Sequence, residues 1–450
     1  MFVLAVISAP AGANDLLSLY QIALTRDATL QAATYQRDAA IEARPQALAQ
    51  LLPQLGAQAG AARERAGFET GAILNSVAAN CVLSANGQME HCYGDVHSYA
   101  LTLTQTLWSW QSFNQLKEAS FQAASAQATL VGAQQNLLLR VAQAYFSILA
   151  AQDQLTTNRN ARASFGTLLN QAQNRQQTGV GPRSDVEQAQ SFYDATEQSV
   201  IDAQNSLDDA NLALTEIVGT HTAKIAPLQE TIPLVSPDPA SVDEWVISSR
   251  RDNPGVRAAE LQVEASERDI SAQRGKGLPT LVLTGSSSHL YQDQALGGNE
   301  PLDSVGVSFN WPLFQGGAVA SAVRQSRAVW RQAEAQYDSV QRDTERLTRA
   351  AYRGIVTGVA RIAAARRAAE SGSSAVDASR RNLEFGTGTE FDLLNAQNNY
   401  YAAQRAYSQT RYDYLTSVLT LKQQAGRLSE GDLVAIDALL IVRDAHNDQG

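Results

Sequence analysis

The sequence predicts a mainly α-helical protein that also carries four short membrane-type β-strands. Three observations predict it: one series of motifs is written twice, long stretches show heptad spacing, and four segments alternate apolar with polar residues. The 450 residues include only 12 Pro, 7% aromatic and 18% charged residues, a composition that favours long helices packed through small side chains. The formal net charge of −10 argues against a nucleic-acid partner, since phosphate binding needs a basic surface.

The repeat is clearest in a glycine motif. Gly179 opens the pattern Gly-x-Gly-x-x-x-Asp-apolar, and Gly386 opens the same pattern 207 residues later. Leu-Pro-x-Leu also occurs twice, around Pro53 and Pro279, where each proline must end a helix because it cannot extend the hydrogen-bond ladder. Because self-similarity of this kind is the signature of a repeated architecture, we expect two internal structural repeats.

The repeat divides the chain into five predicted parts. An apolar start followed by Ala11-Gly12-Ala13 is typical of a secretory signal and its cleavage site, so we expect export from the cytoplasm. Each repeat is expected to contain a helix, a strand pair, a long helix and a return helix. The predicted parts are a signal-peptide remnant at 1–13, repeat 1 at 14–226, a linker at 227–240, repeat 2 at 241–428, and a C-terminal segment and tail at 429–450.

The predicted strands alternate in character along their length. In the segment at about 97–108, Tyr99 and Leu101 lie on one face and Thr102 on the other. The other strands are expected at about 54–66, 280–290 and 303–313. Runs of about 10 residues suit tilted strands of a membrane barrel, and a soluble sandwich would show the same alternation. Four strands are too few to close a membrane barrel, so strands that span a membrane require an oligomer.

The return helices carry a seam of residues spaced alternately by three and four. In the first copy the seam runs from Val186 to Ile217, and it reappears 207 residues later from Leu393 to Gln424. Such heptad spacing is the packing pattern of coiled coils, and the small residues in it let neighbouring helices approach closely. The proline-free stretch from 112 to 178 predicts a helix on the order of 100 Å long, which no globular core needs.

No familiar catalytic motif accompanies these elements. The sequence contains no Gly-x-Ser-x-Gly, His-Glu-x-x-His or Walker-type loop, and its five histidines are scattered without metal-ligand spacing. We therefore expect neither an enzyme nor a cofactor or metal, and energy for any transport step would come from a partner. Cys81 and Cys92 lie in a predicted loop, where an exported chain can join them in a disulfide; a zinc site with His91 or His97 is the alternative.

In these features the chain resembles the TolC family of outer-membrane factors, over about 14–440. The most specific part of the resemblance is the doubled Gly-x-Gly turn with its Asp-x-x-x-Ala-Gln continuation. Further matches are Arg411-Tyr412-x-Tyr414-Leu415 and Ala425-Gly426-x-Leu428. The resemblance implies a homotrimer, in which four strands from each protomer close a twelve-stranded barrel in the outer membrane of a Gram-negative bacterium. It also implies a long periplasmic α-helical barrel with a mixed equatorial belt, to which the linker and the C-terminal segment contribute.

The resemblance further implies a passive export channel surrounded by outer-membrane lipid. Members of the family dock a periplasmic membrane-fusion adaptor and an inner-membrane transporter of the ABC or RND type, and together they export proteins, toxins or drugs. The family's adaptor-contact turns match Gly179, Gly181 and Gly386. These glycines have a simpler role as well, because a tight turn between antiparallel helices often needs a positive φ.

The family also has an acidic periplasmic gate, which the resemblance carries to Asp185 and Asp392. The chain departs from the family at three gate positions that hold a second acid, a latch arginine and its tyrosine partner in the family and are here Asn395, Gly388 and Leu383. Arg183, in the other turn, is a candidate replacement for the missing arginine.

The two acids have an alternative role in starting helices. Ser184 and Glu187 form a Ser-x-x-Glu pattern around Asp185, which predicts a capping box. Thr389 and Asp392 give a similar pair. An acid in the first turn also suits the helix dipole, so helix capping and a gate are both open for these residues.

Two other functions compete with the channel. A soluble periplasmic coiled-coil adaptor or scaffold would share the heptads, but it would not need amphipathic strands at matching positions of two repeats. A periplasmic hydrolase with helical decoration would need a catalytic constellation that the sequence lacks. The outer-membrane channel is therefore the predicted function, with no cargo assigned.

Overall fold

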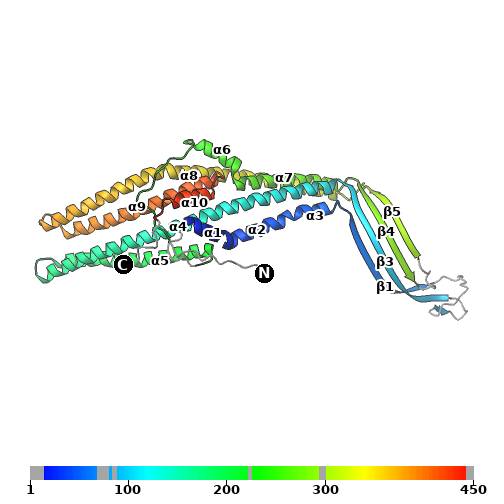
Figure 1. Cartoon of the computed structure of the whole chain (residues 1–450), viewed down its shortest axis with the longest axis horizontal. Helices are drawn as coiled ribbons and strands as arrows, with labels where there is room; N and C mark the ends of the chain where they lie inside the picture. Colours follow the sequence, from blue (N-terminus) through cyan, green and yellow to red (C-terminus); the bar gives the residue numbers. More distant parts are fainter. Residues whose placement is uncertain (1–14, 68–80, 84–88, 221–224, 293–299, 442–450) are drawn as a thin grey trace. The chain divides into compact units, whose positions relative to one another are not determined.

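The computed structural model describes residues 15–67, 81–83, 89–220, 225–292 and 300–441. The predicted signal-peptide remnant at 1–13 lies outside these residues, as do 442–450 of the tail. The described chain is mainly helical with one antiparallel sheet (Figure 1). The helices are α1 (Leu16–Arg26), α2 (Ala28–Ile41), α3 (Ala43–Ala49), α4 (Trp110–Gln177), α5 (Arg183–Val218), α6 (Val242–Asp252), α7 (Pro254–Gly275), α8 (Ala318–Glu384), α9 (Glu390–Gln424) and α10 (Glu430–Asp437). The strands are β1 (Gln54–Gly67), β2 (Cys81–Leu83), β3 (Met89–Ser109), β4 (Thr280–Gln292) and β5 (Glu300–Asn310).

Contacts within the chain divide it into two compact units. The strand unit comprises Asp38–Ala126 and Ala259–Tyr337, and the helical unit comprises Met1–Arg37, Gln127–Ala258 and Asp338–Gly450. Each unit takes segments from both sequence copies, because each copy contributes one strand pair and one helix hairpin. The two units therefore cut across the predicted repeats.

The sheet of the strand unit has the strand order β1-β3-β4-β5, and all neighbours are antiparallel (Figure 1). One row of facing residues crosses it through Leu55, Leu103, Gly285 and Val305. Within the described residues, the outer strands β1 and β5 each pair with one neighbour, β3 and β4 respectively. The short strand β2 pairs with the distal end of β3. The sheet is therefore open at both edges.

The two faces of this sheet differ in chemistry. One face presents apolar side chains that are exposed in the single chain: Leu55, Tyr99, Leu101, Leu103, Val305, Val307 and Phe309. The other face carries small and polar residues, among them Gly56, Gln58, Gly60, Ser98, Thr102, Thr104, Thr284, Ser286, Ser288, Ser304, Gly306 and Ser308. Apolar and polar faces that alternate in this way are typical of a strand between lipid and a water-filled lumen.

The strand bounds differ from prediction in β3 and β5, and β5 begins at Glu300, three residues before its predicted start. β5 ends at Asn310 and not near 313, because Pro312 has no N–H with which to continue the ladder. β3 begins at Met89, well before the predicted start near 97, because its distal end pairs with both β1 and β2.

The two cysteines lie in these extra paired segments and not in a loop as predicted. Cys81 of β2 stands directly opposite Cys92 of β3. Opposite residues of an antiparallel pair have Cα atoms about 4.5–5.5 Å apart, within the range that a disulfide accepts. Their side chains lie outside the described part of the structure, so the disulfide stays a prediction.

The helices that lead into the sheet stop before their prolines, as predicted. α3 ends at Ala49, ahead of Pro53, and α7 ends at Gly275, ahead of Pro279. A Cβ on Gly275 would lie 2.6 Å from the backbone N of Gln111, so only glycine lets the end of α7 approach the start of α4 this closely.

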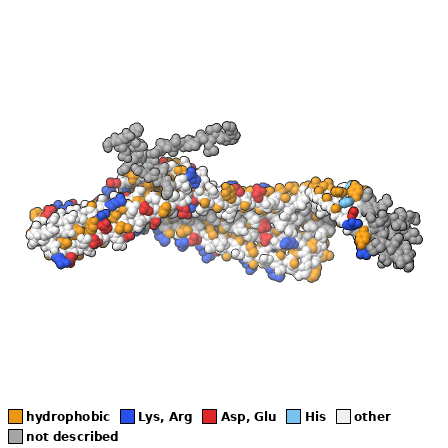
Figure 2. All heavy atoms as spheres, turned by 90° about the horizontal axis from the view of Figure 1, so that it is seen from below, with side chains coloured by type: hydrophobic (Ala, Val, Ile, Leu, Met, Phe, Trp, Pro, Cys, Tyr) orange, Lys and Arg blue, Asp and Glu red, His pale blue; other side chains and the backbone are white. Residues whose placement is uncertain are grey.

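The heptad seams are the packing stripes of α5 and α9. Every predicted seam position, from Val186 to Ile217 and from Leu393 to Gln424, is buried or half-buried in the single chain. Acidic, basic and apolar side chains are interspersed over the visible helices (Figure 2). Within the single chain, α5 and α9 therefore pack through their seams.

The core of the helical unit joins the two ends of the described chain. The C-terminal segment pairs with the linker, where Leu228 and Leu440 form an antiparallel bridge and the Ile441 N–H donates to the Pro227 carbonyl at 2.8 Å. Asp437 of α10 accepts bonds from the backbone N–H groups of Leu16 and Leu17 at 2.8 and 3.0 Å. It thereby satisfies two of the unpaired donors at the start of α1.

Candidate gate at the helix hairpin ends

Two helix hairpins of the helical unit, α4–α5 and α8–α9, end in turns with the same backbone geometry. In the first, the N–H groups of Val180 and Gly181 both donate to the Arg175 carbonyl at 2.9 and 3.0 Å. In the second, the N–H groups of Thr387 and Gly388 both donate to the Asn382 carbonyl at the same two distances. The turns therefore match atom for atom at the offset of 207 residues that the repeat predicts.

The glycines of both turns are required by this geometry. Gly179 has φ +76° and Gly386 has φ +71°, in the left-handed region that side chains with a Cβ avoid. A Cβ on Gly181 would lie 3.0 Å from Cβ of Arg175, and one on Gly388 would lie 2.9 Å from Cβ of Asn382. The positive φ predicted for the turn glycines is present at Gly179 and Gly386, while Gly181 and Gly388 have no positive φ and instead leave room for the side chain of Arg175 or Asn382.

The two return helices begin differently. Thr389 caps α9 in a capping box with Asp392, whose Oδ2 accepts from the Thr389 N–H and hydroxyl at 3.0 and 2.6 Å. These hydrogen bonds hold the pKa of the Asp392 carboxyl below its ordinary value. The capping role predicted for Asp392 is thus present.

The capping box predicted at the first return helix is wrong. α5 begins at Arg183, so Pro182 is its N-cap and Ser184 already lies inside the helix. Proline suits a helix start because its fixed φ is close to the helical value, but it offers no side-chain acceptor. Glu187 instead pairs with Arg183.

The other predicted gate residues lie near these turns on separate elements. Asp185 is in the first turn of α5, half-buried, and its carboxylate accepts from the Ser184 hydroxyl at 3.4 Å. Asn395 of α9 donates its amide to the Phe391 carbonyl at 2.9 Å. Leu383 is half-buried at the end of α8 and packs against a cluster that includes Phe165 of α4.

Arg183 does not join the two hairpins in the described chain. Its Nε lies 2.8 Å from Oε1 of Glu187 on its own helix, and both side chains are exposed. The bond between the hairpins is made instead by Arg175, at the end of α4, and Glu390, the first residue of α9. The Glu390 side chain is 1% exposed, so this ion pair is buried on its acidic side.

Further polar bonds connect α4 with α9 along their length. The hydroxyls of Ser164 and Tyr401 are 2.6 Å apart, and Arg405 donates to Asn158 at 3.1 Å. Burial lowers the pKa of Arg405. Asp153 accepts from Arg411 at 3.3 Å and from the hydroxyl of Tyr412 at 2.8 Å. The hairpin α4–α5 is therefore bonded to the hairpin α8–α9 at four levels.

Sequence reasoning missed these bonds. The two residues of each bond are more than 200 residues apart in the sequence. They also do not occupy corresponding positions in the two repeats, so the repeat gives no sign that they meet. Only one signal pointed to them: Arg411 and Tyr412 belong to a motif that matched the family without an assigned role.

Each turn also exposes one large apolar side chain. Val180 follows Gly179 and is 79% exposed, and Phe385 precedes Gly386 and is also 79% exposed. An isolated apolar side chain on a surface is common. These two are exposed at the ends of both hairpins, although they do not occupy corresponding positions of the repeat.

A model of the family described as Outer membrane efflux protein matches residues 19–220 and 245–427 of the chain. The chain belongs to this family. Outer membrane protein TolC of Vibrio cholerae is 30% identical over 444 residues, which cover 98% of this chain and 97% of that protein. The alkaline protease secretion protein AprF of Pseudomonas aeruginosa is 28% identical and covers 95% of this chain and 88% of its own length. The crystal structure of the outer membrane protein VceC from Vibrio cholerae has a TM-score of 0.76 and 20% identity, covering 91% of this chain and 96% of that one.

Family membership confirms the predicted resemblance, fold class and outer-membrane localisation. It supports the outer-membrane efflux or secretion channel and gives no support to the soluble scaffold. The family is one of transport proteins and not of enzymes. Among the described helices, none is both long and apolar enough to cross a membrane.

Proposed function

We propose that three copies of this chain form a passive export duct, with no catalytic activity of its own. Each copy contributes four strands to one barrel in the outer membrane, and its helices continue the duct into the periplasm. A periplasmic membrane-fusion adaptor docks on the hairpin ends, and an inner-membrane transporter of the ABC or RND type supplies cargo and energy. AprF, by its name, serves the secretion of a protease.

The observation that carries this proposal is the open, two-faced sheet of the strand unit. Its exposed apolar face suits lipid, and its face of Gly, Ser and Thr suits water. Four strands with two unpaired edges cannot stand alone in a membrane, because every backbone N–H and C=O there needs a partner. Pairing β5 of one copy with β1 of the next removes both edges.

Planar-bilayer conductance tests this proposal, with the mass of the detergent-purified protein measured on the same sample. We expect a trimer that gives small, discrete, cation-selective openings. A water-soluble monomer without conductance would contradict the proposal and favour a periplasmic coiled-coil protein.

We propose that Asp185 and Asp392 line the periplasmic gate, so that a trimer carries six carboxylates around one constriction. Cation selectivity and block by multivalent cations should follow from this ring of negative charge. The double variant Asp185→Asn/Asp392→Asn should lose the block, and Glu187→Gln, at an exposed acid of the same helix end, should keep it. Unchanged block in the double variant would remove the acids from the gate.

The Arg175–Glu390 pair is our proposed latch for the closed gate. Gly388 and Leu383 replace the side chains that the family uses, and the buried pair supplies a bond between the same two hairpins. Arg175→Met and Glu390→Gln should each raise the open probability of single channels. The charge exchange Arg175→Glu/Glu390→Arg should restore part of the closed state, which a purely structural defect would not do.

We propose that the exposed side chains at the turns contact the adaptor. Val180 and Phe385 lie beside the left-handed glycines, where no other part of the described chain covers them. Val180→Asp/Phe385→Asp should abolish export in cells while conductance in bilayers stays unchanged. Export at the wild-type level in this variant would exclude the two side chains from docking.

A further inference from the structure

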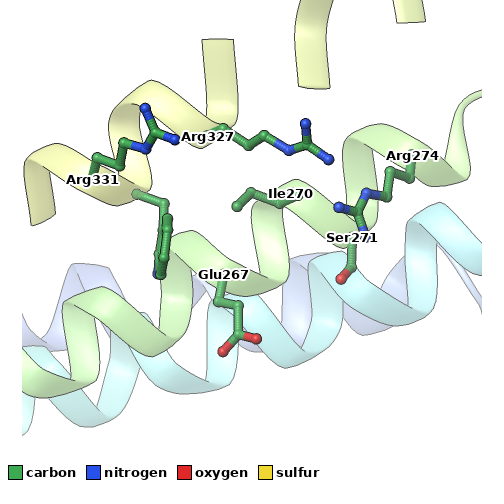
Figure 3. Close-up of a pocket in the computed structure, with 7 residues that line it drawn as sticks. Glu267, Ile270, Ser271, Arg274, Arg327 and Arg331 are labelled. Atoms are coloured by element: carbon green, nitrogen blue, oxygen red, sulfur yellow. The ribbon is translucent and has the colours of Figure 1, made fainter. Parts of the chain in front are cut away.

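A cavity of about 340 Å³ lies between α7 and α8 in the strand unit, and three arginines line it (Figure 3). Arg274 comes from the last turn of α7, and Arg327 and Arg331 come from the first part of α8. Ile270 and the indole of Trp330 provide the apolar part of the lining. The cavity thus combines an apolar surface with a cluster of cations.

The cavity carries an excess of positive charge. Its lining holds one acid, Glu267, against three guanidinium groups. Figure 3 shows Glu267 pointing away from Arg327 and Arg331. Within the described residues, none of the three arginines has a carboxylate partner in an ion pair. Guanidinium groups gathered without partners repel one another, so this arrangement favours an anion between them.

The cavity lies on the two helices that connect to the ends of β4 and β5. Arg274 is six residues before Thr280, where β4 begins. Arg327 is nine residues after the start of α8, which is about 14 Å along the helix. Helical side chains lean toward the N-terminus of their helix, and the N-terminus of α8 is the end that follows β5. A headgroup layer is roughly 5–7 Å thick beyond the hydrocarbon core. The Arg274 guanidinium is therefore within reach of phosphates at the ends of the strands, and Arg327 and Arg331 continue the positive surface from there along α8.

We propose that this cavity binds the phosphates of an anionic phospholipid headgroup in the periplasmic leaflet of the outer membrane. The proposal rests on strands that span this membrane, as the proposed function requires. Guanidinium binds phosphate through two parallel hydrogen bonds, and indole rings favour the membrane interface. Basic pockets next to membrane segments hold cardiolipin-type headgroups elsewhere. An excess of two positive charges matches a headgroup with two phosphates better than a single carboxylate from a second copy of the chain.

Native mass spectrometry of the full chain in detergent tests the proposal, with cardiolipin and phosphatidylcholine as probes. The wild type should retain cardiolipin in preference to phosphatidylcholine. Each of the changes Arg274→Gln, Arg327→Gln and Arg331→Gln should weaken cardiolipin binding about tenfold, the loss expected for one charge-assisted hydrogen bond. Arg324→Gln, on α8 but outside the cavity, is the matched control and should leave binding unchanged. Glu267→Gln should strengthen binding severalfold.

Three outcomes would overturn the proposal. The triple arginine variant could retain as much cardiolipin as the control. Inorganic phosphate could displace the lipid at equal concentration, which would assign the cavity to free anions. The arginine changes could dissociate the oligomer and leave lipid binding per chain intact, which would assign the cavity to an interface between copies.

Conductance of the same samples separates this proposal from the proposed function. A wild type that binds cardiolipin selectively but never conducts would contradict the channel and keep the lipid site. A conducting wild type whose triple variant still binds cardiolipin would contradict the lipid site alone.

Discussion

The two hairpin ends share one backbone and differ in the side chains placed on it. Both turns use a left-handed glycine followed two residues later by a second glycine, and both direct two N–H groups at one carbonyl. The second end adds a capping box at Thr389 and a buried acid at Glu390. The first end begins its return helix with Pro182 and provides the cation Arg175.

The two copies of the repeat have the same turn backbone but different charged residues at corresponding positions. At the offset of 207 residues, Arg175 corresponds to Asn382 and Glu390 corresponds to Arg183. An asparagine and an arginine cannot form the equivalent ion pair, so among the described residues this pair at the hairpin ends is present at one of the two corresponding sites. The backbone could not vary in this way, because the left-handed turns accept little besides glycine.

The largest effect should come from breaking the ion pair. Arg175→Met leaves the Glu390 carboxylate buried without a partner, which costs about 3–5 kcal/mol of stability when a buried pair loses one member. The free energy of local opening at both turns, measured by amide hydrogen exchange, should fall by that order. The double variant Arg175→Met/Glu390→Leu should recover most of the loss, since no charge is then buried alone. A loss confined to the first turn would show that the pair does not couple the two ends.

The glycines should give a smaller effect of equal size at both ends. Gly179→Ala and Gly386→Ala place a Cβ on residues with φ +76° and +71°, which costs about 1–2 kcal/mol each. Nothing lies within 4 Å of either added Cβ, so the cost is one of backbone conformation alone. Amide exchange at the two turns measures both. Costs that differ by more than about 1 kcal/mol would contradict the equivalence of the two turns.

The sequence predicted the features that depend on residue periodicity and on the residue types of turns. The glycine turns follow from a doubled motif, the seams of α5 and α9 from heptad spacing, and the four long strands from alternation. It failed where a partner distant in the chain decides the outcome. The pairing of β2 with β3 moved Cys81 and Cys92 from a loop into strands, and the partner of Glu390 lies 215 residues away at Arg175. The Ser184–Glu187 capping pattern failed because Pro182 is the N-cap, so α5 begins two residues earlier than that pattern predicts.

Removing a hydroxyl near each helix start should destabilise the second hairpin end and leave the first unchanged. Thr389→Val removes the side-chain acceptor for the Asp392 N–H and should cost about 1 kcal/mol at the second turn. Ser184→Ala lies inside α5 and caps nothing, so the first turn should be unchanged within about 0.5 kcal/mol. Exchange of the first-turn amides of α5 and α9 distinguishes the two. Equal losses would mean that Ser184 caps α5 in solution.

The smallest expected difference between the stabilities of the two turns should appear only at acidic pH. Hydrogen bonds from Thr389 hold the pKa of Asp392 below its ordinary value of 3.8. A carboxyl whose folded pKa is depressed contributes stability that is present above the unfolded pKa and is lost as the pH falls through the folded pKa. The second turn should therefore loosen below about pH 4, where the unfolded state binds the proton more readily. A nitroxide label at Thr387→Cys should gain mobility as the pH falls from 5 to 2.5, and the added change Thr389→Val should remove most of that response. If a label at Val180→Cys showed the same transition, the acid response would belong to the whole helical unit, because the first turn has no capping box to lose.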